Sequence, residues 1–452
     1  MSIFPFHIYL SRMDTKDLIE ACKQVLADNQ RGDYTIPAGG LYPHQWLWDS
    51  CFTAIGLANY DVQRAQKEIL SLLRGQWANG MMPNMIFAEG DEHKRDRDMW
   101  QSWRSPYAPD HLSTSGITQP PMLAEAIVRI GAKLDIDDRR RWYQITYPAL
   151  LAFHEWLYRE RDPHEEGLVL LIHPWESGLD NSPPWISQLR MHHKPWWVWL
   201  VEKTHADMVA NIFRRDTQHV SPGQRISNIE ALLYYDVQQR LKRKNWDIDG
   251  ILNRSHFAVQ DLTFNCILLR GHRHLQSIAK TIGYDVPDWL NERARLGRHA
   301  VSEKLWDAFS GQFYSRNFVT HKLIKEPSIA TLMPLYAGLG NDAQVEAMVK
   351  LVRSKDNFGT EFPLPSVPVS YPWYHELKYW QGPVWINTNW LIIDGLTRSG
   401  FTKEAAHIRN QSVKLISEHG PFEYFSAKNG TPAGARQFSW SAALTIDLLS
   451  DT

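Results

Sequence analysis

The segment from residue 142 to residue 157, WYQITYPALLAFHEWL, decides the fold class of this chain. Apolar side chains recur in it at intervals of three and four residues, at Trp142, Ile145, Ala149, Phe153, Trp156 and Leu157. This spacing is the period of an α-helix that buries one face. Because Pro148 interrupts the region 137–160, we expect either two helices or one kinked helix there.

The same period recurs along most of the chain. It is found near residues 15–28, 62–75, 119–133, 225–243, 257–283, 326–338, 381–398, 402–417 and 438–450, and again from Val345 to Val352. Strand-like alternation is scarce, and its best candidate is GLVLLIH at 167–173. Roughly a dozen helices without a repeat of fixed length predict an all-α protein that is not a solenoid.

The domain organisation follows from what separates these helices. No low-complexity linker divides the 452 residues, and closed barrels and toroids of this length fold as one unit, so we expect a single domain over 1–452. Polar or proline-rich connections lie near 88–112, 160–225 and 355–378. Connections of this length usually carry function, and these are where a site could be built.

Charge and composition narrow the classes of function. A net charge of −1 gives no electrostatic case for nucleic acid or for a membrane as partner. No apolar run approaches the length of about 18 residues that spans a bilayer, and residues 1–14 lack the pattern of a signal peptide. Three widely separated cysteines (Cys22, Cys51 and Cys266) suit a reducing compartment. These features predict a cytoplasmic protein.

The 20 tryptophans are the unusual feature of the composition. Aromatic faces pack against the C–H surfaces of sugars, although a large helical core also uses many aromatics. In LYPHQWLWD (41–49), Tyr42, Trp46 and Trp48 offer such faces, and Asp49 can accept hydrogen bonds from sugar hydroxyls. The alternative is that both tryptophans are core residues and that Asp49 caps the next helix.

Two further segments carry polar groups in loop-like contexts. In GITQPP (116–121), Gln119 could bind a sugar hydroxyl or merely cap a helix. In HPWESGLDNSP (173–183), Trp175 is followed by two carboxyls, Glu176 and Asp180, which compete for the role of an acid. An acid that works at neutral pH must stay protonated, and burial beside apolar faces achieves this.

The last quarter of the chain holds the remaining candidates. YWQGPVW (379–385) contains Tyr379, Trp380, Gln381 and Trp385 just before a predicted helix. Glu423, in the aromatic loop GPFEYF (420–425), has no cationic neighbour in sequence and could activate a water molecule. Hydrolysis of a glycoside needs two carboxyls on opposite sides of the scissile bond, and spacing alone cannot pair them.

Four of these segments, in this order, resemble glycoside hydrolase family 63 and, more distantly, the trehalases: LYPHQWLWD, WESGLDNSP, YWQGPVW and FEYF with GARQFSWSA. The length resembles that of the bacterial branch that hydrolyses glucosylglycerate or mannosylglycerate. The resemblance implies an (α/α)6 toroid, with the long connections forming a cap over a pocket at one end. It also implies an inverting mechanism on a small α-glycoside, without a cofactor.

The resemblance assigns roles residue by residue. Asp180 matches the general acid of the family and Glu423 its general base, so Glu176 becomes a structural acid. The glycone-pocket positions are matched by Tyr42, Trp46, Trp48, Asp49, Gln119, Trp175, Tyr379, Trp380, Gln381 and Trp385. The segment FRRDTQH (213–219) resembles a region that supplies an arginine to the substrate carboxylate, and either Arg214 or Arg215 could do so; Arg215 is our candidate.

Other readings stay open at this point. An α-glucosidase or trehalase-like enzyme on a disaccharide or short oligosaccharide would use the same pair of carboxyls. A sugar epimerase would want histidine bases, and a non-catalytic sugar-binding protein would need neither Asp180 nor Glu423. We expect no metal, because His173 and His192-His193 lack the spacing of zinc sites. The sequence does not decide between glucose and mannose or reveal the oligomeric state, although a homo-oligomer is compatible with it.

Overall fold

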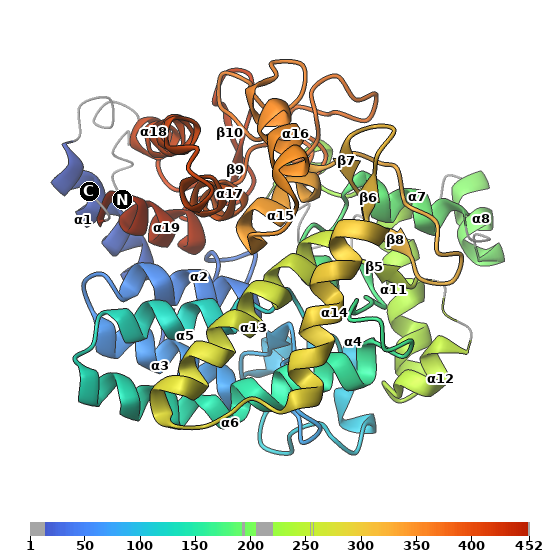
Figure 1. Cartoon of the computed structure of the whole chain (residues 1–452). Coiled ribbons are helices and arrows are strands. Elements are labelled where there is room, and N and C mark those ends of the chain that lie inside the picture. Colours follow the sequence, from blue (N-terminus) through green and yellow to red (C-terminus); the bar gives the residue numbers. More distant parts are fainter. Residues whose placement is uncertain (1–13, 192–194, 205–219, 254, 256, 451–452) are drawn as a thin grey trace, which may run out of the picture.

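The computed structural model describes residues 14–191, 195–204, 220–253, 255 and 257–450. Helices dominate it and alternate along the chain between an inner and an outer ring (Figure 1). The inner ring consists of six helices: α2 (Leu47–Leu57), α5 (Leu123–Ala132), α13 (Leu262–Ile282), α15 (Met333–Ala337), α17 (Ile386–Arg398) and α19 (Ser439–Ser450). Each packs on the next in this order, and α19 packs on α2, so the ring closes.

The outer ring also has six helices: α1 (Thr15–Asp28), α3 (Val62–Leu73), α6 (Ile136–Arg161), α14 (Asp288–Lys304), α16 (Asp342–Arg353) and α18 (Thr402–His419). Among them α1 packs on α19, α3 on α2, α6 on both α5 and α13, and α18 on α17. Two concentric rings of alternating helices are the (α/α)6 toroid, so the predicted fold class is confirmed.

Two helices of the toroid carried no clear periodic signal in the sequence, and α2 shows why. All eleven of its residues are buried, so it has no polar face to set a period. Its close packing on α19 depends on Gly56, because a Cβ there would lie 2.4 Å from the carbonyl oxygen of Ala443. The other helix without a clear signal is α14.

Several predicted boundaries needed correction. Of the two alternatives expected for 137–160, two helices or one, the structure has the single helix α6, with Pro148 inside it. The predicted strand at 167–173 is wrong, because only Leu171 forms a β-bridge, with Val259. The predicted helix at 326–338 is a 3-10 turn, η8 (Ile329–Leu332), followed by the short α15.

The connections contain short elements. Their helices are η3 (Asp91–His93), α4 (Lys94–Trp100), η4 (Ser102–Arg104), η5 (Pro174–Ser177), α7 (Pro183–Met191), α8 (Trp196–Lys203), η7 (Pro222–Gln224), α11 (Asn228–Arg243) and α12 (Ile248–Leu252). Five antiparallel pairs join two-residue strands: β1 (Gln30–Arg31) with β2 (Tyr34–Thr35), β3 (Gln45–Trp46) with β4 (Met85–Ile86), β5 (Val259–Gln260) with β8 (Arg316–Asn317), β6 (Trp306–Asp307) with β7 (Gln312–Phe313), and β9 (Tyr424–Phe425) with β10 (Pro432–Ala433).

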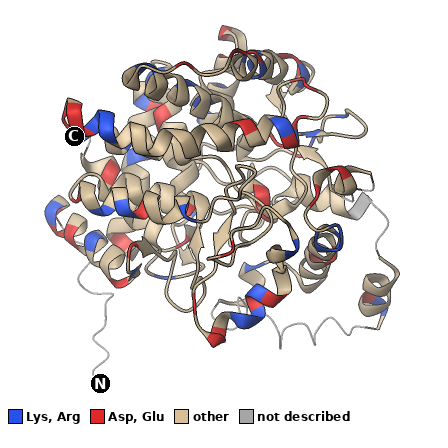
Figure 2. Cartoon of the chain, turned by 90° about the horizontal axis from the view of Figure 1, so that it is seen from below, with Lys and Arg blue, Asp and Glu red and all other residues tan. Residues whose placement is uncertain are grey.

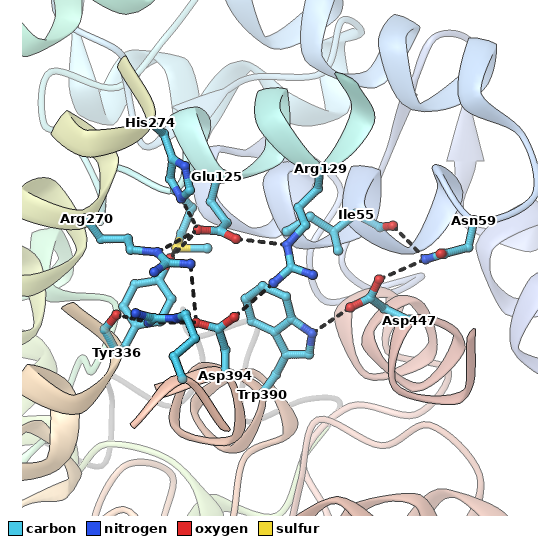
Figure 3. A network of polar contacts seen from close by, with 12 residues as sticks. Ile55, Asn59, Glu125, Arg129, Arg270, His274, Tyr336, Trp390, Asp394 and Asp447 are labelled. Atoms are coloured by element: carbon cyan, nitrogen blue, oxygen red, sulfur yellow. Dashed lines mark hydrogen bonds and ion pairs between the residues drawn. The ribbon is translucent and has the colours of Figure 1, made fainter. Parts of the chain in front are cut away.

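A polar network joins several of the inner helices (Figure 3). Glu125 on α5 accepts hydrogen bonds from His274 on α13 (2.7 Å), Tyr336 on α15 (2.9 Å) and Arg129 (2.9 Å). Arg129 also reaches Asp394 on α17 at 3.1 Å. The network ties four helices of the ring together, α5, α13, α15 and α17.

The surface carries both signs of charge. Lys and Arg lie interspersed with Asp and Glu over the helices in the view of Figure 2. Within the described ranges, no helix is both long and apolar enough to cross a bilayer.

Candidate active site

The candidate residues lie where the inner helices begin. Asp49 is in the first turn of α2, and Gln119 lies just before α5. Asp180 belongs to the long connection from α6 to α13. Tyr379 to Trp385 lead directly into α17, and Glu423 precedes β9, between α18 and α19. Hydrogen bonds join these connections to one another.

Glu423 is buried and its carboxylate has four hydrogen-bond donors. Arg225 binds both oxygens, with Nη1 3.1 Å from Oε1 and Nη2 2.6 Å from Oε2. The Tyr42 hydroxyl donates to Oε1 at 2.8 Å, and the backbone N–H of Ala435 donates to Oε2 at 2.8 Å. The bidentate arginine and the two further donors fix the orientation of this carboxyl.

The loop that carries Glu423 is fixed on two sides. Pairing of β9 with β10 folds it back on itself, and Gly434 has φ +74° beside the carboxylate. A Cβ at Gly434 would lie 2.5 Å from Oε2 of Glu423, so the close approach requires glycine. On the other side, the Tyr424 hydroxyl donates to the carbonyl of Gln224 at 2.6 Å. This contact attaches the Glu423 loop to the segment that ends in Arg225.

Asp180 has different surroundings. Burial raises the pKa of its carboxyl to about 7, and the negative charge of Glu423 adds to the shift. A hydrogen bond of 3.2 Å from the Tyr379 hydroxyl and the charge of Arg225 act in the opposite direction. The backbone carbonyl of Asp180 accepts a hydrogen bond from the Tyr234 hydroxyl. With a pKa near neutrality, this carboxyl can carry a transferable proton at pH 7.

The loop 379–385 is attached to the residue next to Asp180. The side chain of Asn181 accepts a hydrogen bond from the backbone N–H of Trp380 at 2.8 Å. Its backbone carbonyl accepts one from the Gln381 amide at 2.9 Å. Tyr379 itself has φ +45°, a backbone conformation that costs energy in a tyrosine and that the surrounding contacts must hold.

The predicted aromatic residues fall into two groups. Trp48, Trp380 and Trp385 are buried, and the rings of Trp380 and Trp385 stack with centroids 3.8 Å apart. These three pack behind the site. The other four remain partly exposed and can contact a sugar: Tyr42, Trp46, Trp175 and Tyr379.

Asp49 and Gln119 keep unused hydrogen-bonding capacity. Burial raises the pKa of Asp49 well above its usual range, and the charges of Glu423 and Asp180 raise it further, which places the three carboxyls in one cluster. Among the described residues no side chain donates to Asp49, and the amide oxygen of Gln119 is buried without a partner there. Sugar hydroxyls would satisfy both groups.

Glu176 competed with Asp180 in the sequence but has another environment. Both its oxygens are bound by Arg161, at 2.9 and 3.1 Å, and the backbone N–H groups of Thr118 and Ile172 donate to them as well. A buried, fully bonded ion pair fits the structural role expected for Glu176. Arg214 and Arg215 lie outside the described residues.

Sequence reasoning missed Arg225, the cation that binds Glu423. It stands at the end of SPGQR (221–225), in a connection noted only for its polarity. Arginine is common on protein surfaces, and nothing in the sequence shows that this one is buried opposite a carboxyl almost 200 positions away.

One cluster in the described part of the chain has the composition of a metal site: His44, His93 and Asp96. Nδ1 of His44 accepts a hydrogen bond from the N–H of Ala88, so Nε2 carries the ring proton and points it at Asp96, 3.1 Å away. Both ring nitrogens of His44 are therefore used in hydrogen bonds that join it to the 88–100 segment.

Residues 42–441 match the model of the mannosylglycerate hydrolase MGH1-like glycoside hydrolase domain. The chain belongs to this family. The similarity to glycoside hydrolase family 63 is thereby confirmed, and the protein is an O-glycosyl hydrolase of that family's bacterial branch.

Relatives of known activity match over nearly their full lengths. A mannosylglycerate hydrolase of Thermus thermophilus is 36% identical, over 94% of this chain and 98% of the relative. A glucosylglycerate hydrolase of Mycolicibacterium hassiacum is 32% identical, over 94% and 96%. The crystal structure of the family 63 mannosylglycerate hydrolase from T. thermophilus with Tris and D-glycerate superposes with a TM-score of 0.85, at 35% identity over 95% and 99% of the two chains.

Proposed function

We propose that this family member is an inverting hydrolase that releases glucose or mannose from an α-glycoside of glycerate. One observation carries the proposal. Two carboxyls of the same cluster have opposite surroundings, since desolvation raises the pKa of the Asp180 carboxyl to about 7, whereas both oxygens of Glu423 are bound by the Arg225 guanidinium. Pairs of carboxyls whose environments differ in this way divide the roles of acid and base between them.

Asp180 is the general acid in this mechanism. It gives its proton to the glycosidic oxygen as the bond to the anomeric carbon breaks, so that the leaving group departs as a neutral alcohol. Tyr379, which donates to Oδ2 of Asp180, stabilises the carboxylate left behind.

Glu423 is the general base. It takes a proton from a water molecule whose oxygen attacks the anomeric carbon from the face opposite to the leaving group. One displacement of this kind inverts the configuration and turns an α-glycoside into a β-sugar. It requires carboxyls about 6.5–9.5 Å apart, with room for the water between the base and the sugar.

The substrate class rests on the relatives and on the charge of the site. Two relatives are named for glycerate glycosides, whose aglycone carries a carboxylate. Arg225 supplies a buried cation at the catalytic cluster of this chain. Arg215 stays a second candidate for the substrate carboxylate. Asp49, Gln119 and Trp46 are proposed to hold the sugar ring.

A substrate panel tests the proposal. Release of glucose and mannose is measured with glucosylglycerate, mannosylglycerate, trehalose, kojibiose and nigerose. We expect one or both glycerate glycosides to be preferred, with NMR of the first product showing the β-anomer. Preference for a disaccharide would refute the substrate class, and an early α-anomer would refute inversion.

A further inference from the structure

The carboxylate of Glu423 has no free position for the water that it is meant to activate. A carboxylate offers about four in-plane lone pairs. Here Oε1 accepts from Tyr42 and from Arg225 Nη1, and Oε2 accepts from Arg225 Nη2 and from the N–H of Ala435. A catalytic water would be a fifth donor, so one of these contacts must break before the base can work.

Arg225 is the donor whose departure matters most. The other two donors are the backbone N–H of Ala435, in the turn that follows β10, and the Tyr42 hydroxyl, which carries no charge. Arg225 makes two of the four contacts, and its positive charge opposes transfer of a proton to the carboxylate. Release of Arg225 alone would free two lone pairs and remove the positive charge bound to Glu423.

The position of Arg225 leaves it ready to bind another anion. It is 3% exposed, and its Nε–H is buried without a hydrogen-bond partner among the described residues. The guanidinium lies 4.8 Å from the centre of the Tyr379 ring, and Tyr379 in turn donates to Asp180. Arg225 therefore contacts one carboxyl of the mechanism directly, is linked to the other through Tyr379, and keeps its Nε–H unused.

We propose that Arg225 is a gate on the catalytic base, which it occupies in the free enzyme and leaves when the carboxylate of the aglycone binds it. This inference rests on the proposed function. An anionic aglycone thus frees the catalytic base from Arg225. The preference for such substrates therefore arises in the rate of the chemical step as well as in binding affinity.

The energetics favour an exchange of partners over a simple release. A buried guanidinium without an anion is strongly destabilising, so with an uncharged aglycone Arg225 stays on Glu423. A substrate carboxylate can replace Glu423 as its partner, which leaves the number of buried ion pairs unchanged. A ligand shifts such an equilibrium only through a different affinity for the two states, and the carboxylate provides that difference.

An α-glycosyl fluoride separates the gate from binding of the aglycone, because it has no aglycone and its leaving group needs no acid. In its hydrolysis water attacks the anomeric carbon, the C–F bond breaks, fluoride leaves with the electron pair, and Glu423 takes the proton of the water. Free D-glycerate can then occupy the empty aglycone position. We expect D-glycerate to accelerate the reaction, by about 5- to 150-fold if the coupling is of usual size, and glycerol to have no such effect.

Variants test the gate residue itself. In Arg225→Gln we expect fast fluoride hydrolysis that no longer responds to D-glycerate, and in Arg225→Lys a weaker response. Arg240→Gln, which removes a half-exposed arginine of α11, is the matched control and should respond like the wild type. Activation in the wild-type protein does not depend on whether the Arg225 variants fold.

Two outcomes overturn different statements. If D-glycerate only inhibits the wild-type enzyme, or leaves its rate unchanged, while Glu423→Gln is inactive on the fluoride, the gate is wrong and the base assignment stands. If Glu423→Gln hydrolyses the fluoride at the wild-type rate, the base assignment in the proposed function is wrong, and the gate is wrong with it.

Discussion

In the proposed mechanism the chemistry of the site depends on two single residues, Asp180 and Glu423. Neutralising either should cost on the order of 10²–10⁴ or more in kcat, because proton transfer is lost while the size of the side chain is kept. Asp180→Asn and Glu423→Gln are compared in steady-state assays on the preferred glycoside, with circular dichroism to verify folding. Glu176→Gln is the control, because this buried carboxyl lies outside the mechanism. Its replacement should lower the stability of the protein rather than kcat. Full activity in a folded Asp180 variant would refute its role as the acid.

The Tyr379 hydroxyl sets the pH range over which Asp180 can act. Its hydrogen bond favours the ionised carboxylate and holds the pKa of Asp180 below the value that burial alone would give. In Tyr379→Phe the pKa should therefore rise from about 7. Since the acid must be protonated, activity should persist to higher pH, and the alkaline limb of the kcat profile should move upward. An unchanged limb, with Tyr284→Phe as the surface control, would show that Asp180 does not govern it.

How much of the site could be predicted differs from residue to residue. Asp180 was no better than Glu176 by its neighbours in sequence, and only the resemblance to a family separated them. The pKa of Asp180 depends on Arg225 and Glu423, which come from other connections, so spacing along the chain cannot reveal it. The buried tryptophans show the reverse case, because their aromatic character suggested sugar contact and the structure places Trp380 and Trp385 in the packing behind the site.

At the scale of helices, burial decided which elements could be predicted. Most outer helices have one solvent-exposed and one buried face, so their period was evident, as in α6; α14 is the exception. The inner helix α2 is buried on every side, and its apolar run shows no period. Helix starts near Gln119 and Tyr379 were expected a few residues early, because these loops hold apolar side chains that pack like those of the helices that follow.

Contact between the inner helices α2 and α19 depends on the absence of a side chain at Gly56. A Cβ there would lie within 2.6 Å of the backbone and side chain of Ala443, so Gly56→Ala must push the two helices apart. We expect a loss of about 1–3 kcal/mol in the free energy of unfolding, measured by denaturant titration. Gly39→Ala, where no atom lies within 4 Å of the added Cβ, should change it little. Equal effects of the two substitutions would contradict tight packing at Gly56.

At the scale of the whole molecule, the residues proposed for catalysis and the polar network that joins the inner helices are different groups of the toroid. The carboxyls proposed for the active site lie in the first turn of α2 or in the connections outside the inner helices, whereas the network of Glu125, Arg129 and Asp394 lies within α5 and α17 (Figure 3). Every ionic group in the network has a partner, so it can stay charged and rigid. Among the residues that the structure describes, Gln119 and Arg225 keep polar atoms without partners, which a substrate can satisfy. Sequence patterns predicted the helices and the family resemblance implied the toroid, but neither predicted this division, because it depends on partners from different helices.

The pH dependence of global stability reflects histidines that the fold keeps neutral. Burial lowers the pKa of His154 to about 3, and both its ring nitrogens lack partners among the described residues. The unfolded chain binds a proton at this residue near pH 6.5, so the folded state loses stability as pH falls below 6.5 and pays no such penalty above it. Between pH 8 and pH 5 the loss is about 2 kcal/mol for this one group.

Replacing His154 with leucine should remove that part of the pH dependence. Because other buried groups titrate as well, the informative quantity is the difference in unfolding free energy between the variant and the wild-type protein at each pH. We expect this difference to shift by about 2 kcal/mol in favour of His154→Leu between pH 8 and pH 5. Denaturant titrations at the two pH values measure it, and the pH 8 value serves as the control for any change in packing. A difference that is the same at both pH values would mean that His154 is protonated equally in the folded and unfolded chains.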